Sequence, residues 1–197
     1  GGPHSGVYRS KDGGDTWEKL SGVGKGLPGS EDHHVGKVSV RVAPSNSQRV
    51  YVLTEESSPG FYKSDDGGDN WELVTRNHTI NERAPYYTRF DVDPEDQERI
   101  YFASVRFSMS RNGGKTLVEN APRGGGDNHD IWIDPTNPKR FMVAHDGGLG
   151  VTLNHGRTFD QHTLPIAQMY HVHVDNEIPY NVYGNRQDGY SYISTRQ

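Results

Sequence analysis

The sequence predicts an all-β chain of four-stranded antiparallel blades, a segment of a β-propeller. Three observations lead to this prediction. An eight-residue turn pattern occurs four times, and runs of alternating polarity recur between its copies. The 197 residues include 24 glycines and only 31% hydrophobic residues, which suits many short strands and tight turns better than long helices.

The turn pattern is clearest at 64–71, where Ser64, Asp66 and two glycines precede Trp71. A short Asp or Asn side chain accepts hydrogen bonds from the amides of such a turn, and the following glycine supplies a positive φ. Copies begin at 10, 64, 110 and 152, which is 54, 46 and 42 residues apart, a spacing typical of propeller blades. The residues that carry the pattern are Ser10, Asp12, Gly14, Trp17, Ser64, Asp66, Gly68, Trp71, Ser110, Asn112, Gly114, Thr152, Asn154, Gly156 and Phe159.

The remaining strands follow from alternating runs that end in a Pro or Asn turn, such as 131–137, each followed by a second apolar run. We call the four strands of a blade A to D, with C before the turn pattern and D after it. The expected organisation is a half blade at 1–21, full blades at about 36–76, 87–119 and 129–163, and a partial blade at 170–197.

Two completions are open for the terminal strands. They could share one blade and close a four-bladed ring, or the chain could be a segment of a larger propeller. We expect the segment, because the last residues stop where the next turn pattern would begin. Its ends would then meet the remaining blades or neighbouring copies, since open sheet edges invite pairing.

Hairpin connections sort the turns and loops into two faces. The turn face carries the A–B turns and the four turn patterns. The loop face carries 22–37, 54–60, 77–87, 119–129, 145–147, 161–169 and 185–188. Loops on a rigid scaffold are common sites of binding, so the candidate ligand-binding residues are those of the loop face: Tyr86, Tyr87, Asp127, His129, Asp130, His145, Asp146, Arg186, Gln187 and Asp188.

Several of these residues admit a chemical and a structural interpretation. A pair drawn from Asp127, Asp130, Asp146 and Asp188 could serve as acid and base in glycoside hydrolysis, or the carboxylates could cap turns through backbone amides. The histidines 33, 34, 129 and 145 could bind a metal with Asp127, but their spacing is no zinc signature and we expect hydrogen-bonded side chains. We expect Trp17, Trp71, Trp132 and Phe159 to be buried between blades, which leaves Tyr86 and Tyr87 as platforms for a sugar ring.

Composition excludes several classes of function. The net charge of −5, without a basic stripe, argues against nucleic acid as a partner. No apolar run is long enough to insert in a membrane. The absence of Cys excludes disulfides and Cys-based metal sites, and we expect no metal and no cofactor. The first four residues, 1–4, do not resemble a signal peptide and lack an initiator Met, which indicates a processed chain or a piece of a longer one.

The repeated turn resembles the Asp-box of bacterial neuraminidase repeats (BNR), S-x-D-x-G-x-T-W. The wider chain resembles the sortilin-like and xyloglucanase-like branch of Asp-box β-propellers, where the box is a structural turn. Segment 126–135 is similar to that branch's G-D-H-H-x-x-W-I-D-P, 145–148 to N-D-G-G, 164–170 to L-P-I-G-Q-F-Y and 183–188 to the start of Y-G-G-x-Q-D-N-G. Asn128, His145 and Gly189 depart from these patterns.

The resemblance implies two functional hypotheses. One is a noncatalytic binding or scaffold propeller, secreted or in the cell envelope, that engages a protein or glycan ligand across the loop face. The other is a glycoside hydrolase that acts on a polysaccharide with paired Asp residues. The motifs present here identify no catalytic residue, so the fold alone does not decide between the two.

Overall fold

The computed structural model describes residues 4–30, 35–57, 59–119, 126–162, 169–186 and 191–195. The chain divides into two compact units, Gly1–His162 and Thr163–Gln197. One 3₁₀ helix, η1 (His78–Asn81), interrupts an otherwise all-β chain in these ranges. None of the described residues forms a helix with the length and apolarity needed to cross a membrane.

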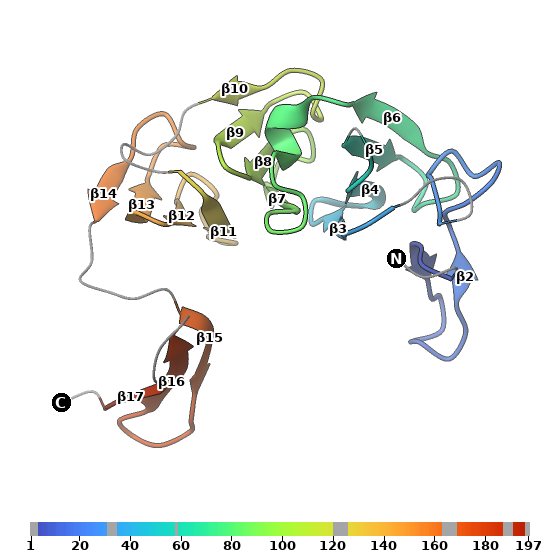
Figure 1. The fold of residues 1–197 in the computed structure, drawn as a ribbon. Coiled ribbons are helices and arrows are strands. Elements are labelled where there is room, and N and C mark those ends of the chain that lie inside the picture. Colours follow the sequence, from blue (N-terminus) through green and yellow to red (C-terminus); the bar gives the residue numbers. More distant parts are fainter. Residues whose placement is uncertain are drawn as a thin grey trace. The chain divides into compact units, whose positions relative to one another are not determined.

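The first unit contains three four-stranded sheets, and in each sheet the strands are hydrogen-bonded in chain order (Figure 1). A two-stranded sheet of β1 (Tyr8–Arg9) and β2 (Glu18–Lys19) precedes them. Blade 1 comprises β3 (Val38–Ala43), β4 (Asn46–Thr54), β5 (Gly60–Ser64) and β6 (Glu72–Thr75). Blade 2 comprises β7 (Arg89–Val92), β8 (Ile100–Ala103), β9 (Phe107–Ser110) and β10 (Val118–Glu119). Blade 3 comprises β11 (Asn128–Ile133), β12 (Phe141–His145), β13 (Gly148–Thr152) and β14 (Asp160–His162). All strand pairs are antiparallel, as the sequence predicts for propeller blades.

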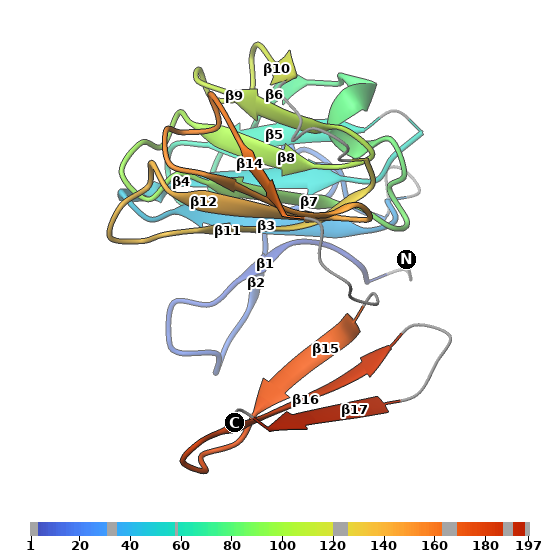
Figure 2. The same ribbon diagram turned by 90° about the vertical axis from the view of Figure 1, so that its left-hand side faces the viewer.

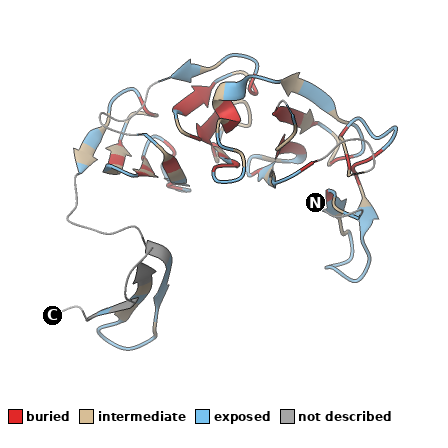
Figure 3. Cartoon of the chain, viewed as in Figure 1, coloured by how far each residue is buried: buried red, intermediate tan, exposed pale blue. Residues whose placement is uncertain are grey.

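The second strands of blades 1 and 2 are buried because sheets cover both of their faces, whereas buried and intermediate residues alternate along β12 of blade 3. Residues 50–54 of β4 and all four residues of β8 are buried, and Figure 3 shows buried residues concentrated in β4, β5, β8 and β9. Between blades 1 and 2, the Phe61 ring lies edge-on to Phe90 and Phe102, with ring centroids 5.3 and 5.0 Å apart. Removing such rings from water supplies most of the free energy that joins the blades.

A second cluster joins blades 2 and 3. Tyr101 and Phe107 of blade 2 contact Phe141 of blade 3, with ring centroids 4.5 and 6.0 Å apart. Ile131 and Phe159 pack against the same cluster. Each blade therefore buries its apolar side chains mainly against its neighbour, which is the pattern of a repeat protein.

The four turn patterns share one hydrogen-bond network. The first residue's hydroxyl accepts the amide N–H of the fifth residue at 2.7, 2.8, 2.8 and 3.0 Å in the four copies. The third residue's carboxylate or amide oxygen accepts the amide N–H of the seventh at 2.9, 2.9, 2.9 and 3.0 Å. Hydrogen bonds from Asn70 and Ser64 lower the pKa of Asp66 to about 2. The fourth residue has positive φ in each copy, at Gly13, Gly67, Gly113 and His155.

Hydrogen bonds also confirm the predicted sorting of turns into two faces. The amide N–H groups of Gly67, Gly113 and His155 donate at 2.8, 2.9 and 3.0 Å to the carbonyls of Gln48, Glu98 and Lys139. Gln48 lies at the start of β4, and the other two lie in the A–B turns of their own blades. Figure 2 shows the strands of these blades lengthwise, running in roughly the same direction, so their connections lie at two opposite ends. The turn patterns therefore occupy one end, and the longer loops occupy the other.

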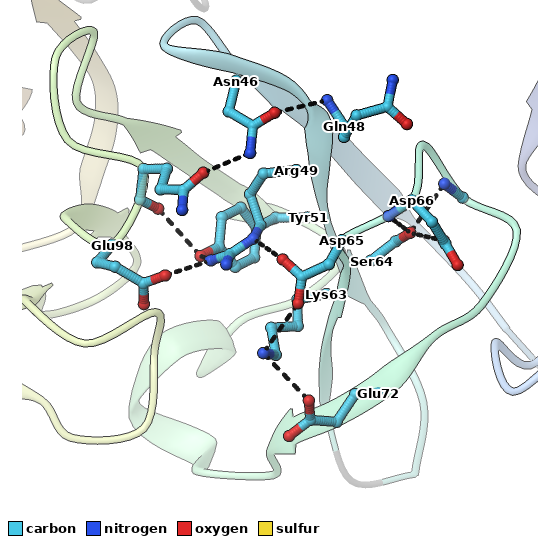
Figure 4. Close-up of polar contacts among 12 residues, drawn as sticks. Asn46, Gln48, Arg49, Tyr51, Lys63, Ser64, Asp65, Asp66, Glu72 and Glu98 are labelled. Carbon is cyan, nitrogen blue, oxygen red and sulfur yellow. Dashed lines mark hydrogen bonds and ion pairs between the residues drawn. The ribbon is translucent and has the colours of Figure 1, made fainter.

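A polar network joins blades 1 and 2 on the turn face (Figure 4). The buried guanidinium of Arg49 pairs with Asp65 and donates to Tyr51 Oη at 2.7 Å and to Glu98 Oε1 at 2.5 Å. Tyr51 Oη donates in turn to the carbonyl of Gln97 at 3.0 Å. Because Glu98 and Gln97 belong to the A–B turn of blade 2, this network fixes the two blades at their polar rim.

The turn aromatics differ in burial, which corrects one prediction. Trp71, Leu117 and Phe159 pack against apolar clusters shared with the preceding sheet. Trp17 is 63% exposed. It belongs to the β1–β2 sheet, and among the described residues no sheet precedes β1.

Trp132 was also expected to be buried, but it is 48% exposed. Its neighbours along β11, Ile131 and Ile133, face the core shared with blade 2. Because side chains alternate along a strand, Trp132 lies on the opposite face of the sheet.

The second unit is one three-stranded antiparallel sheet of β15 (Met169–Val174), β16 (Asn181–Arg186) and β17 (Ser191–Thr195), again in chain order. Asp175 holds its β15–β16 turn. The carboxylate accepts the Asn181 amide at 2.9 Å and the Tyr183 hydroxyl at 2.8 Å. Hydrogen bonds from Asn181 lower the pKa of Asp175 to about 2.

Candidate functional site

The loop that follows blade 1 places two adjacent tyrosines in different environments. After η1, which Asn77 caps by accepting the Thr79 amide, the chain turns so that the amides of Tyr86 and Tyr87 both donate to the Arg83 carbonyl at 2.8 Å. Tyr87 is only 4% exposed, whereas Tyr86 is 57% exposed. Only Tyr86 can therefore offer its ring to a ligand, and the prediction that Tyr87 is a platform is wrong.

The loop before β11 is anchored to blade 2. Asn128 is fully buried, and its side-chain amide donates to the carbonyls of Ser104 and Val105 at 3.0 and 3.2 Å. Asp127 adopts a left-handed conformation with φ 54, and its carboxylate pairs with Arg83 at 3.0 Å. This geometry carries the start of β11 towards the loop that holds the tyrosines.

His129 connects these loops to the β12–β13 turn. Its Nε2 lies 2.6 Å from Asp146 Oδ1, and its ring meets the Tyr87 ring edge-on with centroids 5.1 Å apart. Burial, with the nearby carboxylates of Asp127 and Asp146, raises the pKa of Tyr87. The structure thus brings together four predicted candidates, Tyr87, Asp127, His129 and Asp146, in one contiguous group on the loop face.

His145 has a supporting position rather than an accessible one. It is 6% exposed, and its Nδ1 accepts the Gly147 amide N–H at 3.0 Å. Its Nε2 lies 2.8 Å from the side-chain amide nitrogen of Gln161. Burial also lowers the pKa of His145. Both nitrogens hold the turn that carries Asp146.

The first strands of neighbouring blades are joined by ion pairs that sequence reasoning missed. Arg89 of β7 pairs with the predicted candidate Asp130 of β11 at 2.7 Å, and Arg41 of β3 lies 3.5 Å from Asp91 of β7. Burial, with a contribution from Asp130, raises the pKa of Asp91. Nothing but the alternation of β7 marked Asp91 in the sequence, so no local signal could have identified it.

The side chains of the remaining predicted residues are not described. Arg186 ends β16 in the second unit, and its side chain is not described. Gln187, Asp188, His33 and His34 lie outside the described residues. Within the described ranges, no three His, Asp or Glu side chains are grouped so as to hold a metal ion.

No protein-family model and no curated protein matches this sequence. Solved structures do match. The chain is similar to an ancestral GH74 enzyme with a TM-score of 0.58 and 15% identity, over 96% of this chain and 28% of that one. It is similar to YCF48 bound to D1 peptide with a TM-score of 0.55 and 16% identity, over 98% of this chain and 59% of that one.

A third similar structure is the GH74 xyloglucanase from Xanthomonas campestris, with a TM-score of 0.54 and 13% identity, over 79% of this chain and 27% of that one. These neighbours are β-propellers. The fold is a β-propeller segment. At such identities the likeness shows the fold alone, and the chain spans 27% to 59% of the propeller proteins that it matches.

Proposed function

We propose that this chain belongs to an exported, noncatalytic binding or scaffold propeller that recognises a protein or a glycan on its loop face. The observation that carries the proposal is the pairing of the loop-face carboxylates. Asp127, Asp130 and Asp146 each lie against a cationic or imidazole partner, Arg83, Arg89 and His129 respectively. The pairs of Asp127 and Asp130 join neighbouring blades, and that of Asp146 joins two parts of blade 3. Hydrolysis instead needs two carboxylates that face the substrate.

The ligand class rests on two further observations. Tyr86 exposes an amphipathic ring beside these charged groups, and such rings are enriched where proteins bind proteins or sugars. One similar structure, YCF48, is bound to a D1 peptide. This favours protein binding as a general capacity of the fold without indicating which ligand binds here.

Glycoside hydrolysis is the second candidate, and Asp91 favours it. A general acid must hold a proton near neutral pH, and burial shifts the pKa of Asp91 in that direction. Asp130, on the neighbouring strand β11, would then be the base. Its pairing with Arg89 counts against this role, which is why we place binding first.

Binding measurements on the whole chain separate these functions. We would screen polysaccharides and a peptide library by biolayer interferometry and assay the same polysaccharides for release of reducing ends. The substitutions Tyr86→Ala and His129→Ala should weaken binding, whereas Lys115→Ala, an exposed lysine of the turn face, should not. If only the turn-face variant weakened binding, the proposed face would be wrong. Reducing-end release that Asp91→Asn abolishes would establish the hydrolase instead.

A further inference from the structure

The backbone of Tyr86, whose ring is exposed, contacts a lysine from blade 1. Lys37 directly precedes β3, and its ammonium donates to the Tyr86 carbonyl at 3.3 Å. Both side chains are exposed. The Tyr86 ring also packs on Tyr87, with centroids 5.4 Å apart, so the buried ring supports the exposed one. The Lys37 ammonium is thus held at the backbone of the residue whose ring is exposed.

The cationic side chains of the loop face differ in whether they have a carboxylate partner. Arg83, Arg89 and Arg106 on this face each lie against a carboxylate, whereas the partner of Lys37 is a neutral carbonyl. Glu55 is the carboxylate closest in the strand pairing, but it accepts the backbone amide of Lys37 at 2.7 Å. In the described structure the positive charge beside Tyr86 therefore has no anionic partner within 4.0 Å.

We propose that Tyr86 and Lys37 form a subsite for a uronic acid residue of an acidic polysaccharide. The C–H face of the sugar ring stacks on Tyr86, and the sugar carboxylate pairs with the Lys37 ammonium. This deepens the proposed function, on which it rests, by naming the ligand class. A neutral sugar leaves the Lys37 ammonium without an ionic partner. An acidic peptide supplies a carboxylate but no flat C–H face to stack on the Tyr86 ring.

The test measures binding of oligogalacturonate and of its methyl ester to the whole chain by calorimetry at fixed ionic strength. The ester keeps the sugar ring and removes the charge. Because a charge-assisted hydrogen bond contributes about tenfold in affinity, the free acid should bind about tenfold more tightly than the ester. Lys37→Gln should remove that difference and leave ester binding unchanged, while Lys37→Arg should retain it.

Tyr86→Ala should weaken both ligands about tenfold, and Tyr86→Phe should retain most of the affinity, because stacking needs the ring and not the hydroxyl. Lys115→Gln is the matched control on the turn face. Melting temperatures equal to that of the parent chain would show that the variants fold, as expected for exposed side chains.

Each alternative outcome is informative. Equal affinity for acid and ester, no binding of the acid, or tighter binding of a poly-glutamate peptide would overturn the uronate subsite. If the ester or a neutral xyloglucan oligosaccharide bound in a Tyr86-dependent way without preference for the acid, the loop-face function would stand and the acidic class would fail. If the loop-face substitutions had no effect on any probe but Lys115→Gln did, both proposals would fail.

Discussion

The first and second turn patterns have the same internal geometry and different surroundings. The serine hydroxyls of Ser10 and Ser64 accept the amide of the fifth residue at 2.7 and 2.8 Å, and both third-position aspartates accept the seventh amide at 2.9 Å. Yet Trp17 is 63% exposed, whereas Trp71 packs against a buried cluster that includes Leu20. The turn conformation is therefore set locally, and the burial of its aromatic depends on the preceding sheet.

The largest effect should come from filling a glycine position in a packed copy of the turn. Gly114 has φ 95, and a Cβ there would lie 2.7 Å from the Phe61 ring, which neighbouring rings hold in place. We expect Gly114→Ala to destabilise the chain by about 3 kcal/mol through backbone strain and overpacking. The equivalent Gly14→Ala, with only a 3.9 Å contact to Trp17, should cost about 1 kcal/mol from strain alone. Urea denaturation measures both, and equal losses would show that packing adds nothing.

The aromatic residues allow a second test of the same difference. Truncating a buried Trp costs about 3–5 kcal/mol, and Trp71 is only partly buried, so we expect Trp71→Ala to cost about 2–3 kcal/mol. Trp17→Ala should change stability by less than about 0.5 kcal/mol, as for most surface substitutions. Thermal denaturation followed by circular dichroism distinguishes the two, and a large loss for Trp17→Ala would show that its exposure does not persist in solution.

A smaller effect on stability should come from the Asp66 carboxylate of the second turn, and it should depend on pH. The folded pKa of Asp66 is about 2, below its ordinary value of 3.8, because Asn70 and Ser64 hydrogen-bond the ionised form. Its contribution to stability is therefore present above pH 3.8 and is lost as pH falls towards 2. Asp66→Asn should reduce the loss of melting temperature across this range, because Asn112 shows that an amide fits the same turn. An unchanged pH profile would contradict the assignment.

A small effect at neutral pH should also come from the fourth copy. His155 occupies a position with φ 57 that the other copies fill with Gly, and its Nδ1 accepts from Arg99 at 2.7 Å. His155→Gly would relieve strain but lose this contact, so we expect a change within about 1 kcal/mol at pH 8.

Below neutral pH the stabilities of the parent chain and of His155→Gly should diverge. Burial, then Arg99, lowers the pKa of His155 below 6.5, with Lys139 and Arg157 adding to the effect and Asp93 opposing it. The unfolded chain then binds the proton more readily, so the parent chain loses stability as pH falls through 6.5 and the variant does not lose this contribution. Urea denaturation at pH 8 and pH 5 tests this, and parallel losses in the two chains would refute it.

The sequence allowed the strands, the turns and their sorting into two faces to be predicted, because each depends on residues close together in the chain. Alternation marks β11, and the Ser, Asp and Gly positions define the turns. Burial within an irregular loop carries no such period. Nothing local distinguishes Tyr86 from Tyr87, or the accessible His129 from the buried His145.

The pairing of charges across blades could not be predicted for a related reason. Arg89 and Asp130 are 41 residues apart, and their contact depends on how blades 2 and 3 pack. Asp91 looked like one polar position of an alternating strand until Arg41 and Asp130 were placed beside it. Candidate residues could be assigned to a face from the sequence, but their partners required the structure.

The chain-order pairing of strands also bears on how the protein folds. Each strand of a blade pairs with its neighbour in sequence, so every hairpin closes a short loop and its ordering carries a small entropic penalty. The aromatic clusters, by contrast, draw residues from two successive blades and form only when both are present. During synthesis each hairpin can form as it emerges, and lasting structure should accumulate one interface at a time, from the first blades towards the last.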